Sequence, residues 1–180
     1  NADFAYAMTT LVDQQERRKY SDDRLKKKKY SCSTFMLYLG INKLYQEFPH
    51  HNIIFAEDYK KNVEEIAQHN VLSKDPSFYI QNASVTDSTL APEGKSTIYV
   101  LVPVPNNDSG IDWEQEKKSF RETILNLMEN RGGFHDIRQH IDVEKIITPQ
   151  DWQEQVSVYK GAVFNLGHPL SQIFMFRPHN

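Results

Sequence analysis

The chain has 180 residues, of which 39% are hydrophobic and 12% aromatic, so it can bury the core of one compact domain and is not globally disordered. Its formal net charge is -3, from 24 acidic and 21 basic residues, which argues against a nucleic-acid-binding surface. The single cysteine, Cys32, excludes an internal disulfide and lies in an apolar run, where most thiols are inert core groups.

Two short helices are predicted before the first strand. Asp3 can cap a helix whose apolar residues recur at helical spacing, namely Phe4, Ala7, Met8 and Leu11. Ser21 can cap a second helix that ends in the lysines of residues 26–29, where the helix dipole favours cations. We interpret this lysine run as a solvated helix end rather than as an anion or membrane contact.

Strands are predicted at Ser31–Ile41, Asn52–Ala56, Phe78–Asn82, Lys95–Val104 and Val143–Ile147. The first of these, and the Ile98–Val102 run of the fourth, are apolar at successive positions, which predicts burial on both faces. The strands do not alternate regularly with helices, so we expect an α+β fold. This fold would be a mixed, largely antiparallel sheet with helices packed on one face, in a single domain covering residues 1–180.

Three further helices are predicted. One begins at Asp58 and places its apolar residues on one face, namely Tyr59, Val63 and Ile66. The clearest runs from Trp113 to Glu129, with Asp112 as its cap and two glycines after its end. Thr148 caps the last, with a proline in the first helical position.

The chain lacks the motifs of most common catalytic sites. It has only 7 glycines and contains neither a G-x-G-x-x-G turn nor a P-loop. Ser33 and Ser84 lie near strands, but neither sits in a G-x-S-x-G elbow. His50 and His51 are adjacent and would point to opposite faces of a strand, while Asp136 and His140 form at most a surface pair. We therefore expect no metal site.

Four stretches nevertheless resemble one family. They are YSCSTFMLYLG at residues 30–40, DPSFYIQNASVTD at 75–87, LAPEG at 90–94 continuing through YVLVPVPN at 99–106, and GAVFNL at 161–166 continuing through FRPHN at 176–180. Together they are similar to bacterial-type phytoene desaturases (phytoene dehydrogenases), the flavoproteins of carotenoid biosynthesis. The resemblance runs in the same order over nearly the whole chain.

The resemblance implies a place within a larger enzyme. In that family, glycine-rich FAD-binding segments flank the region that this chain resembles. The chain therefore looks like the substrate-binding domain of a flavin-dependent amine oxidase-like or desaturase fold, without its flavin-binding domain. The absence of an initiator Met fits this expectation. FAD is expected in the parent enzyme and none in this chain alone, which would be inactive by itself.

The resemblance also implies a substrate and partners. Desaturation removes two hydrogens from an apolar polyene, so the protein should supply a long apolar cavity while the flavin carries the redox chemistry. A phytoene-like substrate and peripheral attachment to the cell membrane from the cytoplasm are expected, and truncation could expose a dimer-forming surface. Two alternatives stay open: a non-catalytic carrier of apolar ligands and a protein-interaction domain.

The residues that best match the family motifs are the candidates for a place at the substrate cavity or facing the flavin. They are Asn82, Thr86, Asp87, Phe164, Asn165 and His168. Turn capping by the Asn, Thr and Asp side chains is the alternative reading for the polar members of this set. The catalytic residues are not identified by the sequence.

Overall fold

The computed structural model describes residues 2–177, and its central feature is a five-stranded sheet in the order β2-β3-β4-β1-β5. The strands are β1 (Ser33–Ile41), β2 (His51–Ile54), β3 (Phe78–Asn82), β4 (Ser96–Val104) and β5 (Ile141–Ile147). Each neighbouring pair is antiparallel, and β1 pairs with β4 along its whole length. The predicted strands and the α+β class are confirmed, and the sheet is antiparallel throughout.

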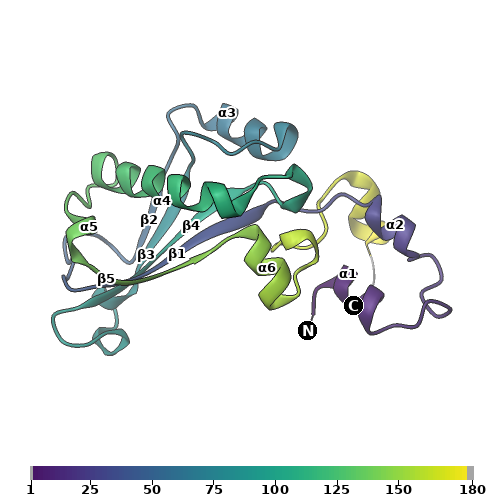
Figure 1. The fold of residues 1–180 in the computed structure, drawn as a ribbon, viewed down its shortest axis with the longest axis horizontal. Coiled ribbons are helices and arrows are strands. Elements are labelled where there is room, and N and C mark those ends of the chain that lie inside the picture. Colours follow the sequence, from purple (N-terminus) through teal and green to yellow (C-terminus); the bar gives the residue numbers. More distant parts are fainter. Residues whose placement is uncertain (1, 178–180) are drawn as a thin grey trace.

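The helices are α1 (Phe4–Thr10), α2 (Asp22–Lys26), α3 (Tyr59–Glu64), α4 (Trp113–Asn130), α5 (Ile137–His140) and α6 (Pro149–Val156). A π-helical turn, Glu65–His69, continues α3. Figure 1 shows α4 lying along one face of the sheet, whereas α1, α2 and the C-terminal segment lie together beyond one end of it. Within residues 2–177, no helix combines the length and the apolar character needed to cross a membrane.

The hydrophobic core lies between α4 and the sheet. Alternate residues of β1 and β4 face the helix and are fully buried, because successive side chains of a strand point to opposite faces. The rings of Phe35 and Phe120 meet edge to face with their centroids 5.0 Å apart, and Trp113 stacks on Phe35 at 5.7 Å. These aromatic contacts hold the start of α4 against the middle of the sheet.

The opposite face of the sheet is covered incompletely. Helix α6 reaches it at the start of β1, where the indole Nε1 of Trp152 donates to the Oγ1 of Thr34 at 3.1 Å, so the helices do not all lie on one face. Farther along β1, Tyr38 is 40% exposed. The predicted burial of Ile98–Val102 on both faces is wrong, because Tyr99 and Leu101 are only half-buried. An apolar run does not reveal whether anything packs on its second face.

The starts of α4 and α6 follow the local sequence signals, whereas Ser21, predicted to cap α2, makes no side-chain hydrogen bond there. Asp112 accepts hydrogen bonds from the backbone N–H groups of Glu114 and Gln115, at 3.1 and 3.3 Å. Thr148 and Asp151 form a reciprocal capping box at the start of α6. The caps predicted for these two helices are therefore confirmed.

Asp136 joins α5 to the loop after β1, and this contact should make stability depend on pH in acid. Two side chains donate to the carboxylate of Asp136: the Nζ of Lys43 at 2.5 Å and the hydroxyl of Tyr45 at 2.8 Å. These hydrogen bonds lower the pKa of Asp136 from 3.8 to about 2. A depressed pKa stabilises the folded state above the unfolded pKa, and this contribution is lost as the pH falls from about 4 towards 2.

We expect Asp136→Asn to remove part of that acid dependence. Urea unfolding at pH 5 and pH 2.5 should show a smaller loss of stability in the variant than in the unchanged protein. Equal losses in the two proteins would contradict the assignment.

Candidate functional site

The structure places the six candidate residues at opposite ends of the sheet. Asn82 ends β3, opposite Ile98 near the start of β4, and Thr86 and Asp87 follow it in the same loop. The other three candidates lie in the segment around Leu166. Leu166 forms an isolated β-bridge with Tyr30, just before β1 begins. Because β1 and β4 are antiparallel, these two groups do not meet in one site.

The first group forms hydrogen bonds within the protein, mostly to the segment between β1 and β2. The Nδ2 of Asn82, which is completely buried, donates to the backbone oxygens of Tyr45 and Phe48 at 2.8 and 3.3 Å. The Thr86 hydroxyl is hydrogen-bonded to His50. Asp87 accepts from the backbone and hydroxyl of Thr89, which lowers the pKa of its carboxyl group. Only the Asp87 bonds are of the turn-capping kind that the sequence offers as an alternative, whereas Asn82 and Thr86 join their segment to the residues before β2.

The second group borders an apolar pocket. Phe164 is 52% exposed and lines the pocket together with His168. Asn165 lies between them in the left-handed region, with φ +66°, and its Oδ1 accepts from the N–H of Leu166 at 2.8 Å. Asn165 thus shapes the loop, whereas Phe164 and His168 present side chains to the pocket.

This pocket, which we call the α3 pocket, has a volume of about 670 Å³. One wall is the apolar side of α3 and its π-helical turn, made by Tyr59, Val63, Ile66 and Ala67. The opposite wall is the segment with Phe164 and His168, and Pro103 at the end of β4 also lines the pocket. Its size and largely apolar lining are typical of a site for a small apolar molecule or part of a larger one.

Sequence reasoning missed the α3 wall. The spacing of Tyr59 and Val63 predicts a shared helix face, but an amphipathic pattern does not reveal whether that face meets a core or a cavity. In the structure Tyr59 is 55% exposed and Val63 is 42% exposed. A π-helical turn is frequent at functional sites, but it has no marker among the sequence patterns that predict helices.

Cys32 also lines the α3 pocket instead of lying in the core, so its expected position is wrong. Burial raises the pKa of its thiol, which keeps the group neutral and poorly nucleophilic. The other buried polar group in the lining is the amide of Asn62, whose side-chain Nδ2 has no hydrogen-bond partner within residues 2–177. The pocket is thus built to bind rather than to supply an activated nucleophile.

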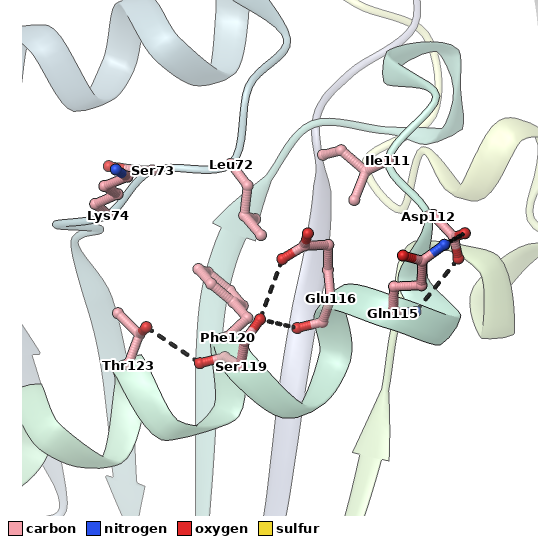
Figure 2. Close-up of a pocket in the computed structure, with 10 residues that line it drawn as sticks. All are labelled: Leu72, Ser73, Lys74, Ile111, Asp112, Gln115, Glu116, Ser119, Phe120 and Thr123. Carbon is pink, nitrogen blue, oxygen red and sulfur yellow. Dashed lines mark hydrogen bonds between the residues drawn. The ribbon is translucent and has the colours of Figure 1, made fainter.

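A second hollow, of about 600 Å³, lies between α4 and the segment Leu72–Lys74 (Figure 2). The polar side chains that α4 and its cap contribute are bonded to one another or to their own helix. Gln115 donates to Asp112 at 2.6 Å, and the Ser119 hydroxyl donates to the backbone and carboxylate of Glu116. Because the polar groups on its α4 side are already paired, the hollow is a weaker candidate than the α3 pocket.

A flavin does not fit the part of the chain that the structure describes. Dinucleotide binding needs a parallel strand–helix–strand unit with a glycine-rich turn. Residues 2–177 form only antiparallel strand pairs, and the sequence has no such turn. We therefore derive no flavin-binding contact from these residues.

No protein-family model matches the chain, but individual proteins do. It is 54% identical over 180 residues to the 4,4'-diapophytoene desaturase (4,4'-diapolycopene-forming) of Methylomonas sp, covering 100% of this chain and 35% of that protein. It is 39% identical over 181 residues to the all-trans-zeta-carotene desaturase of Myxococcus xanthus, covering 99% of this chain and 34% of that protein.

A 4,4'-diapophytoene desaturase (4,4'-diaponeurosporene-forming) of Staphylococcus aureus (strain Newman) is 38% identical over 185 residues, covering 99% of this chain and 37% of that protein. The chain thus spans about a third of the length of these curated relatives. Identity at this level over all of the chain establishes homology. The chain is therefore a homologue of one segment of the carotenoid desaturases.

Proposed function

We propose that this chain is the substrate-binding part of an FAD-dependent desaturase that introduces double bonds into phytoene or a related carotenoid precursor. The observation that carries the proposal is the α3 pocket, in which Phe164 and His168, from a segment that resembles the desaturases, meet the apolar side of α3. The desaturase names of the relatives supply the reaction class.

The chemistry of such a substrate agrees with this pocket. A hydrocarbon polyene offers no charged or strongly polar group, so its binding depends on apolar contact and shape. FAD would accept the hydrogens and would be held by segments outside residues 2–177. The role proposed for this chain is to hold one region of the polyene in a fixed position, as the substrate domain of an amine oxidase-like flavoprotein.

The same proposal includes peripheral contact with the cytoplasmic face of the cell membrane. A substrate of this kind dissolves in the bilayer rather than in water. An enzyme that takes it up from there would work at the membrane surface.

The proposal is tested with this chain in its native flanking sequence, loaded with FAD and supplied with phytoene or 4,4'-diapophytoene in lipid vesicles. Stepwise appearance of longer conjugated polyenes, followed by absorption spectroscopy and chromatography, is expected. A folded, flavin-loaded protein that leaves both hydrocarbons unchanged would refute the desaturase. Tight polyene binding without new double bonds would instead favour a carrier.

A further inference from the structure

The amide of Asn62 is an exception in the apolar wall of the α3 pocket. Its side chain is only 3% exposed, and its Oδ1 accepts from the backbone N–H of Ser77 at 3.0 Å. That bond fixes which amide atom is the oxygen, because a backbone N–H must meet an acceptor. The Nδ2 is buried and has no hydrogen-bond partner in the described part of the chain.

Two other polar side chains in the pocket lining, Ser31 and Asn106, already have hydrogen-bond partners. The Ser31 hydroxyl donates to the backbone oxygen of Cys32 at 2.8 Å and accepts from the N–H of Phe164 at 3.1 Å. Asn106 donates to the backbone oxygen of Ser31 at 2.7 Å and accepts from the N–H of Asp108 at 2.9 Å. Buried donors are rarely left unpaired, so the free N–H groups of Asn62 require an explanation.

We propose that the α3 pocket receives an apolar ligand that carries a carbonyl oxygen, and that the Nδ2 of Asn62 donates to this oxygen. The inference rests on the pocket of the proposed function and adds a requirement for the ligand, because a pure hydrocarbon has no hydrogen-bond acceptor. The nitrogen is covered by its neighbours in this conformation, so side chains of the pocket lining must move aside as the ligand enters.

A carbonyl on an apolar body occurs in two kinds of molecule. One is a polyene aldehyde or ketone, an oxidised relative of the proposed substrate. The other is a quinone. Both offer an sp² oxygen at the edge of a flat, conjugated body, and a single buried donor with apolar walls suits either one.

The test compares three probes on this chain with its native flanking sequence: a polyene aldehyde, the hydrocarbon polyene of the same length, and a short-chain quinone. We expect the aldehyde or the quinone to bind about tenfold more tightly than the hydrocarbon, as one well-placed hydrogen bond allows. Asn62→Leu should remove this preference. Gln68→Leu, which changes an exposed amide outside the pocket, should leave it unchanged.

The outcomes separate this inference from the proposed function. Equal binding of all three probes, unaltered in Asn62→Leu, overturns the inference and leaves the apolar site standing. Failure of all three to bind overturns both. If Asn62→Leu does not fold, the hydrogen bond is tested instead by the frequency of the infrared carbonyl band of the aldehyde bound to the unchanged protein. A shift to lower frequency than in a hydrocarbon solvent supports the hydrogen bond, and an unshifted band overturns it.

Discussion

Replacing Gly161 by alanine should lower the free energy of unfolding by about 2–4 kcal/mol, combining left-handed backbone strain with a steric overlap. Gly161 has φ +64°, a region that residues with a Cβ rarely adopt. A Cβ built there would lie 2.2 Å from the backbone oxygen of Pro149, the first residue of α6. Because that oxygen belongs to a helix, the segment that begins at Gly161 would have to move.

Gly94 provides the matched control, because it shares the backbone conformation without the overlap. Its φ is +74°, and a Cβ there would meet nothing within 4 Å. Gly94→Ala should therefore cost only the strain, about 1–2 kcal/mol. Urea denaturation of the two variants measures the difference. Equal losses of stability would show that the contact between Gly161 and Pro149 is not as close as described.

Gly161→Ala should also change the shape of the α3 pocket. Gly161 lies three residues before Phe164 and opens the segment that forms one wall of the pocket. A displaced segment would separate Phe164 and His168 from α3. Ligand affinity should therefore fall in Gly161→Ala and stay unchanged in Gly94→Ala.

Local signals predict local structure in this chain. Asp112 and Thr148 mark where α4 and α6 begin, because a cap depends on a few neighbouring residues. The antiparallel pairing of β1 with β4 joins residues about sixty positions apart, and no short motif encodes it. The sequence thus predicted the elements and the class of the fold, while their pairing order required the structure.

The candidate site was predictable only in part, for a related reason. Motif resemblance led to Phe164 and His168, which do line a pocket, and to Asn82, which bonds to a loop at the other end of the sheet. A linear motif does not distinguish a residue that shapes a turn from one that faces a cavity. The opposite wall comes from α3, about a hundred residues earlier, so only the tertiary structure unites the two.

Filling the α3 pocket should reduce its affinity for apolar ligands strongly without unfolding the protein. Ala67 is exposed and lines the pocket from the π-helical turn, so Ala67→Trp adds a large side chain to the cavity and removes no core contact. Lost contact area between ligand and wall should weaken binding of a polyene by at least about tenfold, which corresponds to about 1.4 kcal/mol. Titration with phytoene in mixed micelles measures this change.

Gln68→Trp is the matched control for this effect. Gln68 is exposed and adjacent to Ala67, but it lies outside the pocket lining because successive residues of a helix point in different directions. Gln68→Trp adds the same side chain to the same turn, so any nonspecific binding of the polyene to an exposed tryptophan appears in both variants. A loss of polyene affinity in Ala67→Trp alone would place the ligand against α3. Equal behaviour of the two variants would mean that the polyene binds elsewhere, and the uncovered sheet face around Tyr38 would be the next surface to test.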